Sequence, residues 1–427
     1  MEGILLKLPP DVRQFNRGNK VIFINPALPA WVVTNELGAM VLSLFDGSVD
    51  ACGVADVVAE ALGPQSRGKV LDFCRRVVDS GLLSERVGPL RPERQDLHSV
   101  HLSVSRGCNL HCVYCYAAQR TEAGQPNLAL GEWQRVVDDL TGRYPDLTFT
   151  ITGGEPLLSP LALPLAEYIA AKGCRTLLLT NGLLINGNNI ERIAHAFSLV
   201  TLSIDGTTRQ SHAATRGDNL DCVLAAARLL ESRGVDYTVS MTVTRLNINQ
   251  VEPMARRFGG RLNYQPLFPV SGYSSSHLSI TGAEYYAALK SAAGVNPLSY
   301  CETSLSQALH HPVTKCAIAD GEISISPSGD VYPCQLLHVP EFLAGNVRSH
   351  SVLHIIDHSG ALSRCASLHV DSLPECSHCA LRYICGGACR ARGYYETGRI
   401  EQSGRFCEYE LNAFLDGIAS IYSTDLL

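Results

Sequence analysis

Three cysteines on one short segment are the first residues of this sequence whose types and spacing could do chemistry. Residues 105–116 read Ser-Arg-Gly-Cys-Asn-Leu-His-Cys-Val-Tyr-Cys-Tyr, which gives Cys108, Cys112 and Cys115 a C-x3-C-x2-C spacing. Three thiolates on one loop can each hold one iron of a four-iron cluster and leave the fourth iron open to another ligand. A zinc site completed by a remote fourth ligand is the alternative that the spacing leaves open.

A second group of cysteines lies toward the C-terminal end. Its spacing is C-x12-G-x4-C, then a gap, then C-x2-C-x5-C-x3-C-x17-C, with Gly329 as the glycine and with the members Cys316, Cys334, Cys376, Cys379, Cys385, Cys389 and Cys407. Chance does not explain seven cysteines placed in this way, although a zinc ribbon remains an alternative for the C-x2-C pair. Four others are scattered in apolar segments, and we expect them to be buried structural thiols: Cys52, Cys74, Cys174 and Cys222.

Composition narrows the class of protein. The chain has 427 residues, of which 46% are hydrophobic and 18% charged, so it can bury a large core and is not disordered. Its formal net charge of −6 disfavours a general nucleic-acid binder. No apolar run reaches the roughly 18 residues of a membrane span, and the first ten residues do not read as a signal peptide. We therefore expect a cytoplasmic protein without membrane or nucleic-acid partners, whose 16 cysteines serve metal or redox chemistry.

The elements that must position the first cysteines are alternating strands and helices. Strands are predicted at 100–105, 147–152, 175–180, 199–204, 237–244 and 261–267, with helices near 130–142, 160–172, 188–196, 219–232 and 248–258. This alternation is typical of a parallel α/β sheet, and six strands are too few for a closed eight-stranded barrel. The predicted fold is therefore a partial (β/α)6 barrel. Cys108 follows the first strand, at the sheet end where active sites form in such folds.

A glycine pair follows the second predicted strand, in the segment Thr152-Gly153-Gly154-Glu155-Pro156. Two glycines let a ligand approach the backbone closely, and the carboxylate of Glu155 beside them can pair with a cationic amine. An ordinary turn is the alternative. The segment gains weight because it lies at the same sheet end as the first group of cysteines.

Further regions flank this sheet. We predict a small domain at 1–90, with a strand at 21–24 and helices near 37–45, 52–62 and 68–80, a pattern similar to a winged-helix domain. A polar, proline-containing stretch follows it, and the linker is placed at 91–98. The barrel is assigned to 99–296, and a cysteine-rich domain with a final helix at 408–421 is assigned to 297–427.

The cysteine and glycine motifs together resemble those of the radical S-adenosylmethionine (radical SAM) superfamily. Its C-x3-C-x-aromatic-C motif appears as Cys108, Cys112, Tyr114 and Cys115, and its GGE motif as Gly153-Gly154-Glu155. The resemblance implies a [4Fe–4S] cluster on the three cysteines and SAM chelated to the open iron, whose cleavage gives a 5′-deoxyadenosyl radical that abstracts hydrogen from a substrate. It also implies SAM contacts from Tyr114, Gly153, Gly154, Glu155, Asn181, Ser203, Asp205 and Arg216, although Asn181 reads equally well as a turn residue.

The second group of cysteines resembles the SPASM extension of radical SAM enzymes. This resemblance implies two auxiliary [4Fe–4S] clusters, and so three clusters in all. The outer one would lie on Cys376, Cys379, Cys385 and Cys407, and the inner one on Cys316, Cys334 and Cys389. The fourth inner ligand is left open between Cys301, Cys365, Glu322 and no protein ligand.

One departure from the family pattern concerns the residue after Cys334. Sulfatase-maturing members carry an Asp after the Pro-Cys pair, and this Asp serves as their general base. Here Gln335 follows Pro333-Cys334. Because a carboxamide cannot accept the proton, sulfatase maturation is not expected.

Residues 1–85 resemble the small chaperone of pyrroloquinoline quinone biosynthesis, a fold also called the RiPP recognition element (RiPP: ribosomally made and post-translationally modified peptide). The matching features are Pro9-Pro10, the strand at 21–24, the segment 37–47 and Gly81-Leu82-Leu83. The resemblance implies that a leader peptide binds as an added strand on a sheet edge. A DNA-binding winged helix and an oligomerisation lid are the alternatives, and the near-neutral local charge disfavours DNA.

The combination of regions predicts a peptide maturase, because a leader-binding domain tethered to the barrel raises the concentration of the peptide at the radical site. It would bind a ribosomal precursor peptide and install an intramolecular thioether, C–C or C–O cross-link. Electrons would come from a flavodoxin- or ferredoxin-like partner. The alternatives are a radical SAM enzyme that builds a small-molecule or peptide-derived cofactor of quinone or haem type, and a zinc-bound regulator that binds peptide or DNA.

Overall fold

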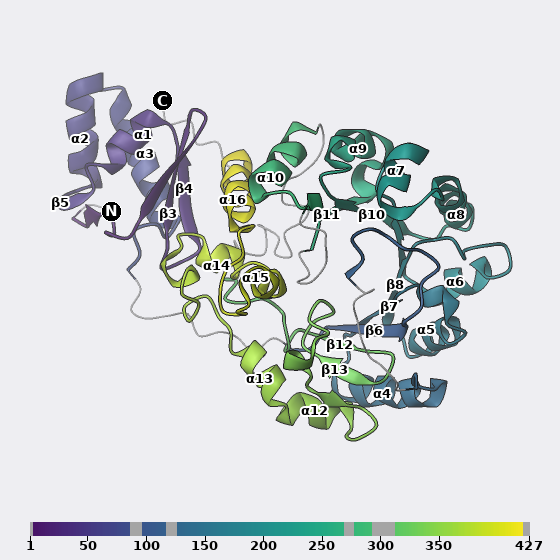
Figure 1. Cartoon of the computed structure of the whole chain (residues 1–427). Coiled ribbons are helices and arrows are strands. Elements are labelled where there is room, and N and C mark those ends of the chain that lie inside the picture. Colours follow the sequence, from purple (N-terminus) through teal and green to yellow (C-terminus); the bar gives the residue numbers. More distant parts are fainter. Residues whose placement is uncertain (1–2, 86–95, 117–125, 269–276, 293–311, 422–427) are drawn as a thin grey trace.

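The largest feature of the fold is a nine-stranded sheet in the order β11-β10-β9-β8-β7-β6-β12-β13-β14 (Figure 1). The computed structural model describes residues 3–85, 96–116, 126–268, 277–292 and 312–421. Six consecutive strands of the sheet are parallel: β6 (Ser99–Ser105), β7 (Thr148–Gly153), β8 (Arg175–Thr180), β9 (Leu199–Ser203), β10 (Tyr237–Val243) and β11 (Leu262–Pro266). They match the six predicted strands to within one residue at each end. Because β6 and β11 are not neighbours in the order, the barrel is open, as predicted.

Helices join the parallel strands and lie around the outside of the sheet in Figure 1. The predicted ones are confirmed as α4 (Leu130–Arg143), α5 (Ala162–Ala171), α6 (Ile190–Ala196), α8 (Leu220–Ser232) and α9 (Val251–Phe258). Strand β10 shows why the two faces of the sheet differ. Val239, Met241 and Val243 are buried in the main core, whereas the hydroxyl side chains that alternate with them are only half-buried. Because side chains alternate between the two faces of a strand, the apolar face of the sheet is directed toward the helices and the opposite face is polar.

The C-terminal region continues the sheet, which the sequence did not predict. Strand β12 (Glu322–Ile325) pairs in parallel with β6, and β13 (Asp330–Tyr332) and β14 (Gly345–Asn346) follow in antiparallel order. The remaining helices of this part are α12 (Val352–His358), α13 (Gly360–Ala366), α14 (Arg382–Cys385), α15 (Arg390–Thr397) and α16 (Cys407–Ile421), of which α16 confirms the predicted final helix. Another helix, α10 (Gly282–Ser291), packs against α16.

The first 85 residues form a separate small unit. It contains a three-stranded antiparallel sheet of β2 (Arg13–Arg17), β3 (Lys20–Asn25) and β4 (Ala30–Thr34), a short pair of β1 (Leu5–Lys7) and β5 (Asp46–Asp50), and the helices α1 (Glu36–Leu42), α2 (Ala51–Leu62) and α3 (Ser66–Asp79). The sequence predicted the three helices but only β3 among the strands. Strand β2 was missed because its residues, Arg-Gln-Phe-Asn-Arg, are mostly polar and largely exposed.

The two faces of this small sheet pack against different parts of the molecule. Val21, Phe23 and Val32 join the core formed with α1, α2 and α3. The opposite face packs against the end of the chain in one apolar cluster, made of Ile22, Ile24, Trp31, Val33, Leu381, Ile384, Phe414, Leu415 and Ile418. Burial on both faces explains why residues 21–24 of β3 are all apolar. The N-terminal unit is therefore attached to the cysteine-rich part by a core of its own.

Two smaller findings complete the fold. Among the scattered cysteines Cys74 is buried as expected, but Cys52 and Cys174 are half-buried and Cys222 is exposed, because it lies on the outer side of α8. None of the helices in the described ranges combines the length and apolarity needed to cross a membrane.

Candidate functional site

The first group of cysteines lies on a loop that the end of β7 holds in place. The backbone N–H of Gly154 donates to the carbonyl of Ser105 at 2.8 Å, and that of Glu155 donates to the carbonyl of Gly107 at 2.8 Å. A Cβ on Gly153 would overlap the backbone of Ser105, and a Cβ on Gly154 would overlap the carbonyl of Gly107. The glycine pair was predicted to let a ligand approach, which stays a prediction; in the structure it is the chain's own cysteine loop that approaches the two glycines.

Glu155 is also used by the protein itself. Its side chain is fully buried, and its carboxylate accepts hydrogen bonds from the N–H of Leu157 (3.0 Å), the hydroxyl of Thr180 (2.8 Å) and the N–H of Asn181 (2.8 Å). Burial raises the pKa of Glu155, while these hydrogen bonds act in the opposite direction. The carboxylate that was expected to pair with a ligand amine is thus already held by hydrogen bonds within the protein, and its pairing with an amine stays a prediction. Glu155 joins the ends of β7 and β8 beneath the cysteine loop.

Asn181 has the turn role that the sequence offered for it and also contacts the cysteine loop, while its predicted contact with SAM stays a prediction. Its side-chain oxygen accepts from the N–H of Leu183 at 3.0 Å, which is the turn role, and Gly182 after it has a φ of +80°. Its amide nitrogen lies 2.8 Å from the side-chain oxygen of Asn109 and 3.9 Å from the sulfur of Cys108. The residue therefore ties the end of β8 to the cysteine loop.

Cys108 and Cys112 lie close enough to the other thiols of the loop for these to affect their pKa. Burial raises the pKa of Cys108, and Cys115 is among the further groups that raise it. Burial also raises the pKa of Cys112, Arg216 lowers it, and Cys115 and Cys108 raise it again. The structure thus gathers Cys108, Cys112 and Cys115 at the carboxyl end of β6, as predicted. Thiolates set closely together favour a metal centre that neutralises them.

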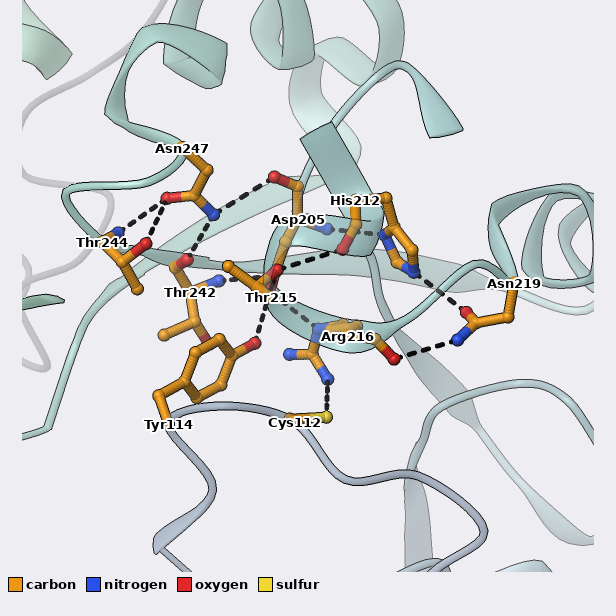
Figure 2. Close-up of polar contacts among 10 residues, drawn as sticks. All are labelled: Cys112, Tyr114, Asp205, His212, Thr215, Arg216, Asn219, Thr242, Thr244 and Asn247. Carbon is orange, nitrogen blue, oxygen red and sulfur yellow. Dashed lines mark hydrogen bonds and ion pairs between the residues drawn. The ribbon is translucent and has the colours of Figure 1, made fainter. Parts of the chain in front are cut away.

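Asp205 is the centre of a buried network beside this loop (Figure 2). It directly follows Ile204 after β9 and is fully buried. One carboxylate oxygen accepts from the hydroxyls of Tyr114 and Thr215, the latter at 2.8 Å, and pairs with Nε of Arg216 at 2.9 Å. The other oxygen accepts from the N–H of Thr242 at 2.9 Å. Three predicted site residues, Tyr114, Asp205 and Arg216, are therefore brought together.

Arg216 connects this network to the cysteines. Its Nη1 lies 3.9 Å from the sulfur of Cys112, and its guanidinium carbon lies 5.4 Å from the ring centroid of Tyr114. In addition, the N–H of Val113 donates to the carbonyl of Thr215 at 3.0 Å. The pKa of Arg216 is raised by the charge of Asp205, against the effect of burial. The guanidinium stays charged and places a positive charge beside Cys112.

The sequence missed the element that makes this possible. Arg216 is the last residue of α7 (Arg209–Arg216), whose sequence Arg-Gln-Ser-His-Ala-Ala-Thr-Arg has no apolar periodicity. Thr208 caps its first turn by accepting from the N–H of Ser211. The Thr-x-x-Ser spacing was the available signal for this helix start.

Two further residues of the network were not predicted. His212 is fully buried, its Nδ1 accepts from the N–H of Asp205 at 3.2 Å, and its Nε2 lies 2.9 Å from the side-chain oxygen of Asn219. Burial lowers the pKa of His212, so the ring is neutral with its proton on Nε2. Asn247 donates to the carbonyls of Asp205 (3.2 Å) and Thr242 (2.9 Å). Ser203, by contrast, is half-buried at the end of β9 and stands opposite Ser240, outside the network.

The inner group of cysteines gathers beside β12 and β13. Burial raises the pKa of Cys334 well above its ordinary value, and Glu322, Cys389 and Cys316 raise it further. The antiparallel ladder pairs Ser324 of β12 with Tyr332, two residues before Cys334. Nε2 of His101 lies 3.7 Å from a carboxylate oxygen of Glu322.

Of the other candidates for the fourth inner position, Cys365 stands apart from these thiols. Cys365 is fully buried in α13, and burial raises its pKa to about 11 with smaller effects from Arg364 and Glu401 rather than from these thiols. Cys301 lies outside the described residues. Gln335 follows Cys334 and is half-buried.

The outer group gathers where α14 and α16 meet. Burial raises the pKa of Cys385 well above its ordinary value, and the nearby Glu410, Cys407 and Cys376 raise this pKa further. The pKa of Cys407 is raised to about 11 by burial and then by Cys379 and Cys376. Within the described part of the chain, no three cysteine, histidine or acidic side chains converge on one metal ion.

Known protein families match both the barrel and the cysteine-rich region of this chain. The family model of the radical SAM superfamily matches residues 102–258, and that of the SPASM iron–sulfur cluster-binding domain matches residues 316–380. These domains imply SAM and iron–sulfur clusters as cofactors.

Two relatives and one solved structure illustrate the likeness. An AdoMet-dependent heme synthase of Methanosarcina barkeri is 24% identical over 337 residues, which are 72% of this chain and 95% of the relative. The mycofactocin maturase MftC of Mycobacterium ulcerans is 28% identical over 306 residues, 67% of this chain and 81% of the relative. Streptococcus suis SuiB bound to its precursor peptide SuiA has a similar fold, with a TM-score of 0.59, 15% identity and coverage of 93% of this chain and 98% of SuiB.

Proposed function

The chain is a radical SAM enzyme with a SPASM domain, and we propose that it binds a ribosomal precursor peptide and installs an intramolecular cross-link in it. The observation that carries this proposal is the N-terminal sheet, which is packed onto the cysteine-rich part through a shared apolar cluster. The fold likeness to SuiB includes most of this unit, since it covers 93% of the chain. The cross-link would be a thioether, a C–C or a C–O bond.

The first cluster and SAM belong, in this proposal, to the carboxyl end of the parallel strands. Cys108, Cys112 and Cys115 would hold a [4Fe–4S] cluster, and SAM would lie near Tyr114, Gly153, Gly154, Asn181 and Ser203. When bound, this pair supplies one-electron chemistry that removes a hydrogen atom from a substrate. The protein's part is to hold the loop, through Glu155 and the Asp205–Arg216 pair, and to place a positive charge beside Cys112.

Two auxiliary clusters would complete the set of three. We assign the outer one to Cys376, Cys379, Cys385 and Cys407, and the inner one to Cys316, Cys334 and Cys389. Glu322 is the preferred fourth inner ligand, because its charge raises the pKa of Cys334, whereas the pKa of Cys365 is affected by other residues. A flavodoxin- or ferredoxin-like protein of the cytoplasm would supply the electrons.

The peptide would be recognised by the N-terminal unit, which we assign to residues 1–90 as a RiPP recognition element, joined by a linker at 91–98 to a barrel at 99–296 and a SPASM region at 297–427. Strand β3 is the central strand of its sheet, so a leader would pair with an edge strand, β2 or β4. The Gln335 side chain after Cys334 cannot serve as a general base, which disfavours sulfatase maturation.

A second candidate function rests on one specific comparison. The relative from Methanosarcina barkeri, matched over 95% of its length, is an AdoMet-dependent heme synthase. A tetrapyrrole-modifying activity would use the same barrel and clusters, but it would give the N-terminal sheet no leader to bind.

Mass spectrometry distinguishes the two. The full chain would be produced anaerobically with the short open reading frame nearest its gene, and the intact mass of the peptide would be measured. Loss of two hydrogens per site supports cross-linking, and fragmentation then locates the bond. An unchanged peptide mass while SAM is converted to 5′-deoxyadenosine would contradict cross-linking and favour the tetrapyrrole or another small molecule.

A further inference from the structure

Arg390, the first residue of α15, is a buried cation without an acidic partner. Its side chain is 1% exposed, and none of the carboxylates in the described residues forms an ion pair with it. Its Nη2 donates to the carbonyl of Gly387, and its Nη1 lies 3.4–3.5 Å from the carbonyls of residues 400–402. Its Nε is buried and has no hydrogen-bond partner.

The other buried arginines show that this is unusual within the molecule. Arg216 pairs with Asp205 at 2.9 Å. Arg392, two residues after Arg390 and 5% exposed, pairs with Glu396 at 3.7 Å and donates to the carbonyls of Pro266 and Leu267. A buried charge is costly unless something of the opposite charge lies nearby, and carbonyl dipoles compensate only part of that cost.

The surroundings of Arg390 point to what carries that opposite charge. The carbonyls that hold its guanidinium belong to two segments, one between Cys385 and Cys389 and one that leads into Cys407. On the second segment, the hydroxyl of Ser403 lies 3.4 Å from the sulfur of Cys376. Arg390 also lowers the pKa of Cys407, after the larger effects of burial and of the neighbouring thiols and Glu410, which raise it. The cation is therefore enclosed by the segments that carry the outer group of cysteines.

We propose that Arg390 is the counter-charge of the outer auxiliary cluster and sets its reduction potential. This inference rests on the proposed assignment of Cys376, Cys379, Cys385 and Cys407 to that cluster. A cluster held by four thiolates carries a net negative charge, which grows by one when it accepts an electron. A fixed buried cation stabilises the reduced form more than the oxidised form, so it raises the potential. Arg390 is then a positioning residue for electron transfer and makes no contact with a substrate.

The test is a redox titration of the full chain, reconstituted anaerobically and followed by electron paramagnetic resonance. The Cys108→Ala, Cys112→Ala, Cys115→Ala background removes the first cluster, so that only auxiliary signals remain. Arg390→Gln is expected to shift one auxiliary midpoint to a more negative potential, by the roughly 59 mV that correspond to a tenfold change in a one-electron equilibrium. Arg390→Lys keeps the charge and is expected to restore most of the shift.

Arg392→Gln is the matched control, because it removes a neighbouring buried cation that has its own carboxylate. It is expected to leave both auxiliary midpoints in place. Unchanged midpoints in Arg390→Gln, or an equal shift in Arg392→Gln, would overturn the inference.

If Arg390→Gln loses a cluster, the iron content of the variants is measured in place of the midpoint potential. Loss of one cluster in Arg390→Gln but not in Arg390→Lys supports a need for the charge. Loss in both would overturn the inference, because the guanidinium hydrogen bonds would then be what matters. A parent chain that binds no auxiliary cluster would instead refute the proposed function on which the inference rests.

Discussion

Gly154 lies so close to Gly107 that a Cβ on Gly154 would overlap the carbonyl oxygen of Gly107. The same carbonyl accepts a hydrogen bond from the N–H of Glu155 at 2.8 Å. The end of β7 and the start of the cysteine loop therefore close on each other backbone to backbone. The glycine pair is needed at this point because any side chain would separate the two segments.

Gly154→Ala should displace the cysteine loop, because the Cβ would meet rigid backbone rather than a flexible side chain. We expect the purified variant to lose the iron of one cluster and to lose SAM cleavage, while the auxiliary clusters remain. Iron analysis and 5′-deoxyadenosine formation measure both. Gly142→Ala in α4, where a Cβ would meet nothing within 4 Å, is the control and should be neutral or stabilising by up to about 1 kcal/mol. Full iron content in Gly154→Ala would contradict this account.

Cys108→Ala should separate catalysis from recognition. The thiol belongs to the barrel loop, whereas the proposed leader-binding sheet lies in the first 85 residues. We expect SAM cleavage to be abolished and the affinity for the leader peptide, measured by fluorescence anisotropy, to be unchanged. Equal loss of both would mean that the two roles are wrongly assigned to these domains.

Glu322 should matter more than Cys365 for the inner cluster. Glu322→Ala removes a carboxylate whose charge raises the pKa of Cys334, and we expect a changed resonance signal or lost iron at one auxiliary cluster. Glu322→Cys offers a thiolate at the same position and should keep the iron. Cys365→Ala is the matched control and should leave the signal intact, because that thiol lies in the core of α13. The opposite pattern would assign the ligand to Cys365.

His212 should make the barrel sensitive to acid. Its folded-state pKa lies below the ordinary value of about 6.5, so the unfolded chain binds this proton more readily than the folded chain. Stability is therefore lost as the pH falls below about 6.5. Thermal unfolding of the parent and of His212→Gln between pH 7.5 and about 5.5 would reveal this, with a smaller decline expected for the variant. Parallel declines would show that His212 is not the group that titrates.

The sequence by itself determined the parallel strands, most of the barrel helices and the grouping of the cysteines. These features depend on local patterns. Apolar residues recur at every second position in strands and at every third or fourth position in helices, and the thiols of one group lie a few residues apart. The strands β6 to β11 were located to within a residue for this reason. Missed elements such as β2 and α7 have mostly polar sequences without such an apolar pattern.

Only the tertiary structure decided what the polar site residues do. Tyr114 and Asp205 are 91 positions apart, and Cys112 and Arg216 are 104 apart, so no local pattern could show that they meet. The same holds for Glu155, whose carboxylate is taken up by Thr180 and Asn181 of the next strand. Residue types fix which chemistry is available. The packing of distant segments decides which groups lie next to a buried charge. A buried charge depends on these neighbours because it has no water to bind.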